Sequence, residues 1–453
     1  MGRAIVVEAN EIPPRVVDWW IEHTPTTPLR ALRESGTYVH TRLEETLPRD
    51  LYPSQSWASV GMGAPWAEHG VFWYGDPKPA THRFYWQRAA DAGKTVGLVG
   101  VLHSSPVAQQ CAHPNFRFVI PDVFSDDPTT IPAKLEPIQA LNLRLTRQSA
   151  RVASTAFSFD DVRTVGSFVR NGVRPTTFAR LGALAAGVAT KRANKERLRV
   201  GQVILMGDVF EHLVEEHDPD LAVFFTNHVA SAMHRYWAAT FPQDWDSHPY
   251  GDAWIEAYKD ELPFAMRALD DLLRRLLDLG ERTEREVLIV SSMGQHADTD
   301  VDPSETHQAV VRDPQHFLDA LACPVEVVDY RPVMVPQLSA SFVDSSAAQA
   351  FESWLRERLG NAIADTLVAD EVVTATVHLT CDEHAVLIGD ERLAPESIGA
   401  SIESVSDHRS GRHHPVGVLL SSARSEWPDE VDALSIGDRI LDRFTTGSPL
   451  TKI

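Results

Sequence analysis

The chain has 453 residues and a formal net charge of −21, with 43% hydrophobic and 23% charged residues. This length allows a large core, and the composition is ordinary for a soluble globular protein. The excess of acidic side chains argues against a nucleic-acid partner, because binding to a phosphate backbone requires clustered Lys and Arg. Any phosphate or sulfate group would therefore have to be held by a local cluster of side chains.

The cysteines and the apolar segments indicate the cellular compartment of the protein. Cys111, Cys323 and Cys381 are far apart and odd in number, a pattern typical of a reducing compartment. The N-terminus resembles a short apolar strand rather than a signal peptide. The stretch 181–189 is rich in small apolar residues but shorter than the roughly 20 residues needed to span a bilayer. We therefore expect a soluble cytoplasmic protein with no membrane partner.

Apolar runs and helical spacing alternate along the chain. The run at 4–7 predicts a strand, and Pro14 followed by the amphipathic stretch 16–21 predicts a helix with proline in its first turn. Near-helical spacing over 252–279 predicts a long helical region that Pro263 kinks or divides. Further apolar strands are predicted at 95–101, 221–225 and 287–290.

This alternation predicts an α/β fold, with a mostly parallel central sheet flanked by helices. Ligands of such sheets bind at the carboxyl ends of the strands. Two regions interrupt this alternation of strands and helices. Residues 121–207 are predicted to form a helical cap insertion, and residues 321–399 a second variable insertion. The remaining α/β core is predicted to comprise 1–120, 208–320 and 400–453.

Three local patterns fall within these insertions. The basic run 191–199 is interleaved with Glu196 and Leu198. This favours a solvated helix face over an anion-binding patch. Short strand patterns occur at 325–328 and 385–388.

The segment from Tyr52 to Gly70 is the most informative part of the sequence. It places a small hydroxyl residue, Ser56, before Trp57, followed by a Gly-containing turn, a proline and a His-Gly pair. This pattern resembles the nucleophile region of the alkaline phosphatase superfamily, especially its type I phosphodiesterase and nucleotide pyrophosphatase branch. The resemblance implies an alkaline-phosphatase-like fold in which Ser56 attacks phosphorus or sulfur while bound to a metal. It also implies a structural role for His69.

Further elements occur in the order that this superfamily shows. Asn10, after the first predicted strand, stands where a metal-binding Asp belongs. His234 lies in a His-Arg-Tyr-Trp pattern that resembles the phosphodiesterase branch, but Ala230 replaces the Asp expected four residues earlier. A Gly-Arg-His-His pattern near the C-terminus puts His413 at a ligand position.

The differences from the superfamily pattern remove negative charge from the second metal position. The Asp and His expected after a later strand are replaced by Ser292 and Met293, and only Asn10 and Ser56 remain beside them. A hard dication held by no carboxylate would lack the negative charge that such sites require. The resemblance therefore implies a degenerate two-metal site.

The first metal position keeps two imidazoles. One divalent metal, Zn²⁺ or another, could be bound by His234 and His413 together with a third group, because such a site with an open position suffices for Lewis-acid chemistry. The candidates for this third group include His228, Glu8 and Glu11.

A second interpretation needs no metal. His234 or His228 would then act as the general base for Ser56. A developing oxyanion would be stabilised by Asn10, Gln295 and His413.

We therefore expect a hydrolase or group transferase that acts on a phosphate or sulfate ester through Ser56, with one or no divalent metal. Its partner would be a small anionic substrate. The alternative is a catalytically inert pseudoenzyme that binds a small anionic ligand or a protein partner. The predicted catalytic residues are Ser56, His234 and Asn10; the predicted substrate-binding residues are His228, Ser292, Gln295, Glu8 and Glu11; the predicted metal ligands are His234 and His413.

Overall fold

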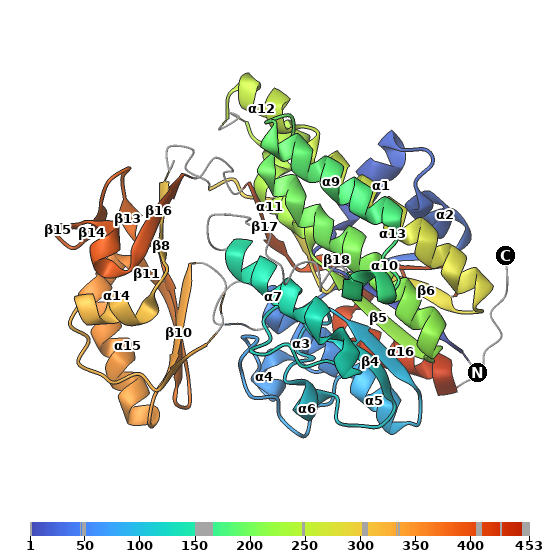
Figure 1. Ribbon diagram of the computed structural model, residues 1–453, viewed down its shortest axis with the longest axis horizontal. Helices are drawn as coiled ribbons and strands as arrows, with labels where there is room; N and C mark the ends of the chain where they lie inside the picture. The colour runs from blue at the N-terminus through green and yellow to red at the C-terminus, as the bar shows by residue number, and fades with distance from the viewer. Residues whose placement is uncertain are drawn as a thin grey trace. The chain divides into compact units, whose positions relative to one another are not determined.

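Figure 1 shows the computed structural model of the chain. It describes residues 2–45, 47, 51–149, 166–246, 250–300, 307–331, 333, 336–404, 410–425 and 428–445. The chain divides into two compact units, the first comprising residues 1–299 and 409–453 and the second residues 300–408. Among the described residues, no helix combines the length and apolar character needed to cross a membrane.

An eight-stranded mixed sheet forms the centre of the first unit. Five of its seven neighbouring strand pairs are parallel, and of these eight strands only β18 is antiparallel to both of its neighbours. The predicted α/β fold with a mostly parallel sheet is therefore confirmed. In spatial order the strands are β19 (Glu430–Asp432), β2 (Thr37–Arg42), β18 (Val416–Ser421), β6 (Glu286–Val290), β1 (Ala4–Ala9), β5 (Leu221–Thr226), β3 (Val96–Val99) and β4 (Phe116–Ile120).

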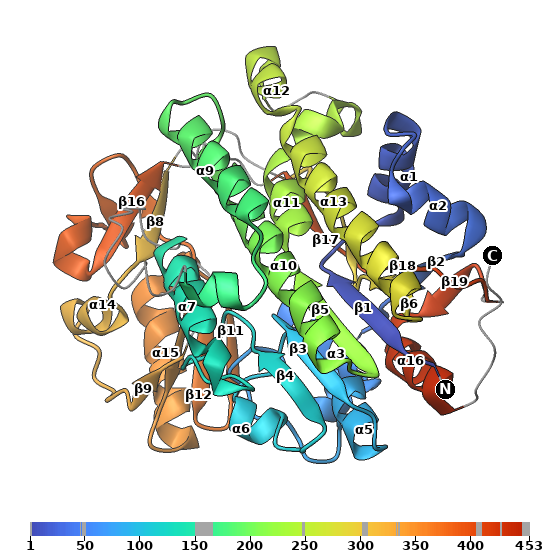
Figure 2. The ribbon, with the colours of Figure 1, turned by 45° about the vertical axis from the view of Figure 1, so that its right-hand side comes forward.

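Helices cover both faces of this sheet, and β1 is buried along its whole length. Ile5 and Val7 belong to one apolar cluster and Ala4 and Val6 to the other, because successive side chains of a strand point to opposite faces. Helices α10 and α13 pack against each other and lie side by side in Figure 2. The first cluster includes residues of α1 (Pro14–His23), α2 (Pro28–Ser35), α10 (Val200–His217), α11 (His228–Thr240) and α13 (Glu261–Arg282), and the second includes residues of α3 (Pro53–Met62), α5 (Tyr85–Asp91) and α16 (Ile436–Thr445).

The remaining helices and strands complete the first unit. The basic run contributes the short helix η2 (Lys195–Arg199), in which Arg197 pairs with Glu261 and Arg199 with Glu196. The others are α4 (Trp66–His69), α6 (Val107–Gln110), η1 (Ala133–Leu135), α7 (Glu136–Ser149), α9 (Pro175–Ala189), η3 (Pro242–Asp244), α12 (Asp252–Tyr258), β7 (Gly294–Ala297), β17 (Gly411–His414) and η6 (Ala433–Ser435).

Of the two predictions that rest on prolines, the one for Pro14 is confirmed and the one for Pro263 is wrong. Helix α1 begins at Pro14, as predicted. The helical region over 252–279 is divided, but the break falls at Lys259–Asp260. Pro263 lies in the first turn of α13, where its missing N–H removes no intrahelical hydrogen bond.

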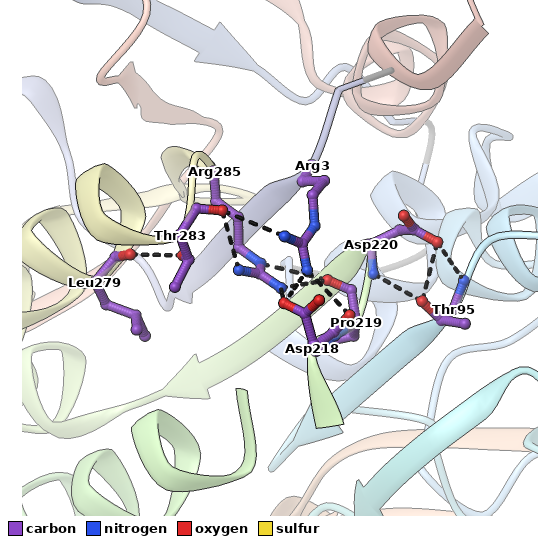
Figure 3. A network of polar contacts seen from close by, with 8 residues as sticks. All are labelled: Arg3, Thr95, Asp218, Pro219, Asp220, Leu279, Thr283 and Arg285. Carbon is purple, nitrogen blue, oxygen red and sulfur yellow. Dashed lines mark hydrogen bonds and ion pairs between the residues drawn. The ribbon is translucent and has the colours of Figure 1, made fainter. Parts of the chain in front are cut away.

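A polar network ties together the amino ends of the central strands (Figure 3). The buried guanidinium of Arg285 donates to the Pro219 carbonyl oxygen at 2.8 Å and to Asp218 Oδ1 at 2.7 Å. Arg3 also pairs with Asp218. The network therefore joins the segments that lead into β1, β5 and β6 at the edge of the sheet opposite to their carboxyl ends.

The second unit has its own apolar core, formed by α14 (Pro314–Ala320), α15 (Ser345–Leu359) and several short strands. The predicted strand at 385–388 is present as β14 (Val386–Ile388). The strand predicted at 325–328 is wrong, because the strand β9 (Asp329–Tyr330) begins only at Asp329. Val328, the last residue of the predicted segment, is exposed, although its N–H donates to the Ser341 carbonyl oxygen of β10 (Gln337–Ser341) at 2.9 Å. The remaining elements are β8 (His307–Val311), β9 (Asp329–Tyr330), β10 (Gln337–Ser341), η4 (Gly360–Ala362), β11 (Ile363–Ala369), β12 (Val372–Val377), β13 (Thr380–Cys381), β15 (Glu391–Leu393), η5 (Pro395–Ile398) and β16 (Ala400–Ser404).

Candidate metal centre

The carboxyl ends of β1, β5 and β6 meet at one edge of the central sheet. Glu11 follows β1, His234 lies on α11 after β5, and Ser292 follows β6. The strands β7 and β17 form an antiparallel ribbon in which Gln295 is paired with His413. The parallel topology thus gathers side chains that are up to about 400 residues apart in the sequence.

Glu11, His234 and His413 form a compact group whose ligand atoms all lie within 4.8 Å of one another. Glu11 Oε2 is 2.8 Å from His234 Nε2 and 3.5 Å from His413 Nε2. In a tetrahedral site with Zn bonds of about 2.0–2.1 Å, neighbouring ligand atoms are roughly 3.3 Å apart. The two distances from Glu11 lie on either side of this value, so the group is compact enough for all three donors to bind one divalent cation.

The surroundings of the two imidazoles are consistent with metal binding. His234 Nδ1 lies 2.8 Å from the Gly411 carbonyl oxygen, which can only accept, so Nδ1 carries a hydrogen and Nε2 faces Glu11. A backbone carbonyl on the outer nitrogen is how metal-binding imidazoles are commonly oriented. The His413 ring contacts the rings of His234 and Tyr52, with centroids 5.0 and 5.6 Å apart.

Glu11 is the buried member of the group, and its backbone is unusual. Its φ is 59°, in the left-handed region that non-glycine residues seldom adopt. Burial alone would raise the pKa of Glu11, but the nearby imidazoles of His413 and His234 hold it below the usual range of a carboxyl group. The surroundings of Glu11 thus favour the ionised form of its carboxyl group.

Two buried amides contact the Glu11 carboxylate. Asn10 Nδ2 donates to Glu11 Oε1 at 2.7 Å, and Gln295 Nε2 donates to Glu11 Oε2. Asn10 Nδ2 also donates to Asn227 Oδ1 at 2.7 Å, and Asn10 Oδ1 accepts from Trp57 Nε1 at 2.8 Å. Asn10 is therefore bonded on three sides within the protein.

Ser56 lies apart from this group. Its hydroxyl is fully buried and lies 2.8 Å from Ser292 Oγ and 3.4 Å from the Pro53 carbonyl oxygen. The structure thus brings together two predicted residues, Ser56 and Ser292, but among the residues that it describes no imidazole forms a hydrogen bond with the Ser56 hydroxyl.

Glu8 and His228 also lie outside the group. Tyr85 donates its hydroxyl hydrogen to Glu8 Oε1 at 2.9 Å, and burial raises the pKa of Glu8 to about 8. His228 Nε2 donates to the Ala265 carbonyl oxygen at 3.1 Å and its Nδ1 lies 2.7 Å from Thr226 Oγ1. Burial lowers the pKa of His228 to about 4, so both ring nitrogens serve neutral hydrogen bonds within the fold.

Other residues at the site had no role assigned from the sequence. Asn227 precedes α11 and holds Asn10, while Tyr52 precedes α3 and packs on His413. Both lie within the motifs that carry the family resemblance, which is the one signal that could have pointed to them. His69, given a structural role by the resemblance, lies 2.9 Å from Ser59 Oγ through its Nε2.

The fold and site define an α/β protein with a candidate mononuclear metal centre at the carboxyl edge of its sheet. No protein-family model and no curated protein matches the chain.

Two solved structures show what the chain is similar to in fold. One is phosphonoacetate hydrolase from Sinorhizobium meliloti 1021 in complex with phosphonoacetate, with 12% identity and a TM-score of 0.42 over 97% of this chain and 95% of that chain. Another is murine ectonucleotide pyrophosphatase/phosphodiesterase 5, with 8% identity and a TM-score of 0.41 over 100% of this chain and 96% of that chain. The similarity extends over nearly the full length of each chain and concerns the fold alone. The superfamily resemblance continues to rest on the motif residues.

Proposed function

We propose that this protein is a hydrolase or group transferase that uses one divalent metal, held by Glu11, His234 and His413, to act on a phosphate or sulfate ester. The observation that supports it is the convergence of one carboxylate and two imidazole nitrogens within 4.8 Å. Two imidazoles with one carboxylate are a donor set that zinc hydrolases use with a further position open. Zn²⁺ is therefore the cation that we expect first.

The chain's own residues prepare this site. When bound, the cation would polarise an ester oxygen as a Lewis acid. Glu11 would supply the negative charge, and the Gly411 carbonyl oxygen keeps the His234 ring turned with Nε2 toward Glu11. The His234 and His413 side chains keep 29% and 17% of their surface exposed, compared with 2% for Glu11. Access to the site is therefore from the imidazole side.

Ser56 is the nucleophile that the family resemblance implies. Its neighbour is another hydroxyl, Ser292, rather than a base. An attack by Ser56 thus requires the hydroxyl to leave this contact and become accessible when substrate binds. The same observation favours the competing function, an inert protein that binds a small anionic ligand or a protein partner on the retained fold.

Metal analysis and an ester panel separate these functions. We expect about one equivalent of Zn²⁺ in the purified wild-type protein, and its loss in His413→Ala. On p-nitrophenyl phosphate, bis-p-nitrophenyl phosphate and p-nitrophenyl sulfate, Ser56→Ala should abolish any turnover while keeping the metal. A metal-loaded wild type that cleaves none of the three esters would favour the inert binding protein. Absence of metal from the wild type, even after incubation with Zn²⁺, would contradict the proposed centre.

A further inference from the structure

We propose that Asn10 and Gln295 are positioning residues, which hold the Glu11 carboxylate in place for the cation and contact neither the cation nor the substrate. This inference rests on the proposed function, because it concerns the same metal centre. It assigns to both amides a role different from the catalytic and substrate-binding roles expected from the sequence.

The orientation of the Asn10 amide is fixed by its neighbours. Trp57 Nε1 can only donate, and it lies 2.8 Å from Asn10 Oδ1. The amide nitrogen must therefore face the other way, toward Glu11 Oε1 and Asn227 Oδ1, each 2.7 Å away. Both of its hydrogens are used by these acceptors. Turning the amide over would set its oxygen against two acceptors and leave the indole hydrogen unpaired.

The orientation of the Gln295 amide follows from its neighbours in the same way. Its Nε2 donates to Glu11 Oε2 and to the Ala230 carbonyl oxygen at 3.2 Å, and both of these atoms can only accept. The amide nitrogen therefore faces Glu11. The position of Gln295 is set by the ribbon, where it is paired with the metal ligand His413. Ala230 stands where the family resemblance expects an Asp, and it accepts this hydrogen bond through its main-chain carbonyl oxygen.

The backbone of Glu11 explains why such support is needed. A side chain at a left-handed φ of 59° follows a sharp turn directly after β1, and a single strained residue persists only where its surroundings over-determine it. The amides donate to both carboxylate oxygens, one to Oε1 and one to Oε2. Together they restrict rotation of the carboxylate and keep Oε2 between the two imidazoles. Partners of this kind typically change metal affinity about 10- to 100-fold when removed.

The test is Zn²⁺ affinity in variants that lack the amide hydrogens. Gln295→Met keeps a side chain of similar length but cannot donate, and Asn10→Ala removes the second donor. The matched control is Gln87→Met, which removes a buried amide that donates to the Gln110 carbonyl oxygen at 2.8 Å and belongs to a different part of the first unit. Affinity is measured by competition with a chelator, thermal unfolding by the metal-free protein, and ligand geometry by the visible absorption of the Co²⁺-loaded protein.

We expect Gln295→Met and Asn10→Ala each to weaken Zn²⁺ binding by about 10- to 100-fold and to alter the Co²⁺ spectrum. Gln87→Met should keep both wild-type affinity and spectrum, even where its melting temperature falls as far as that of Gln295→Met. Wild-type affinity and spectrum in both test variants would overturn the inference and leave the metal centre standing. An equal loss of affinity in Gln87→Met would overturn it as well. A wild-type protein that binds no Zn²⁺ would overturn the proposed function and this inference together.

Discussion

Glu8 and Glu11 are buried carboxyl groups three residues apart, and their surroundings have opposite effects. Glu8 has a single polar partner of note, the Tyr85 hydroxyl, so burial dominates and raises its pKa to about 8. Burial alone would raise the pKa of Glu11 as well, but the imidazoles of His413 and His234 hold it below the usual range. One carboxyl group is therefore neutral at pH 7 and the other is charged.

Replacing Glu8 with Gln should make stability less dependent on pH. The folded-state pKa of about 8 exceeds the unfolded value of about 4.3, so the stability that Glu8 contributes is fully present below pH 4.3 and is lost as the pH rises through 8. Glu8→Gln keeps an acceptor for Tyr85 and carries no charge. We expect the free energy of unfolding of the variant to exceed that of wild type by a few kcal/mol near pH 9, at most about 5. Near pH 4 the two should differ little.

The control for this prediction is Tyr85→Phe, which removes the hydrogen bond that lowers the pKa of Glu8. Its stability should still fall with rising pH, over a range that extends to higher pH than in wild type. The measurement is urea unfolding at several pH values between 4 and 9. A constant difference between wild type and Glu8→Gln across this range would contradict the prediction.

The sequence pointed to the members of the metal group but could not choose among them. Motif spacing predicts His234 and His413 as ligands and leaves Glu11 as one of several candidates for the third ligand. The choice depends on geometry that spacing does not contain. Glu8 lies within β1 and points toward Tyr85, whereas Glu11 lies beyond the strand at a left-handed φ. His228 turns toward α13, where it meets the Ala265 carbonyl oxygen.

At the scale of the elements, the two ends of the central strands carry different polar structures. Their carboxyl ends carry the candidate site, with strained backbone at Glu11. Their amino ends carry the Arg285 network of Figure 3. The apolar runs of the strands were predictable, because a strand buried on both faces is mostly apolar. The Arg285 network was not predictable, since most of its residues lie in the segments that precede the strands, where the fold alone sets their partners.

Arg285→Met should lower the free energy of unfolding by about 1–3 kcal/mol, because it leaves the buried Pro219 carbonyl oxygen without a donor. The Pro219 carbonyl oxygen loses both of its hydrogen bonds from Arg285, whereas the Thr283 carbonyl oxygen keeps a donor in Arg3 Nη1. We give the ion pair with Asp218 little weight, since 68% of the Asp218 side chain is exposed. Arg3→Met serves as the control, with an expected loss below about 1 kcal/mol, because its side chain is partly exposed. Equal losses in the two variants, measured by urea unfolding, would contradict this account.

At the scale of the whole molecule, the second unit is inserted between two paired strands of the first. β7 precedes the insertion and β17 follows it, and Gly411 is paired with Ala297. Beyond this pair, the Asp298 N–H donates to the Ser410 carbonyl oxygen at 2.9 Å. The two points where the chain leaves and re-enters the first unit therefore lie side by side. The second unit has the same arrangement at its own ends, because β8 and β16 are antiparallel neighbours and His307 is paired with Ser404.

Because of this arrangement, residues 300–408 should be replaceable by a short Asn-Gly turn, which is the connection that an antiparallel ribbon favours. All three proposed ligands and both positioning amides belong to the first unit, and two of these residues lie on the β7–β17 ribbon itself. We expect the shortened chain to unfold cooperatively and to bind Zn²⁺ with the stoichiometry and affinity of the full chain. The same chain carrying His413→Ala should bind none.

The excised segment 307–404 offers the complementary test. It holds an apolar core of its own and has paired terminal strands, and it is of a size at which single domains commonly fold alone. A cooperative thermal transition in this segment, together with Zn²⁺ binding by the shortened chain, would place the whole metal centre within the first unit. A shortened chain that folds but has lost its Zn²⁺ affinity would show instead that the second unit is needed to hold the ribbon in register. That outcome would contradict the prediction, since hydrogen bonding between β7 and β17 would then be insufficient to fix Gln295 and His413.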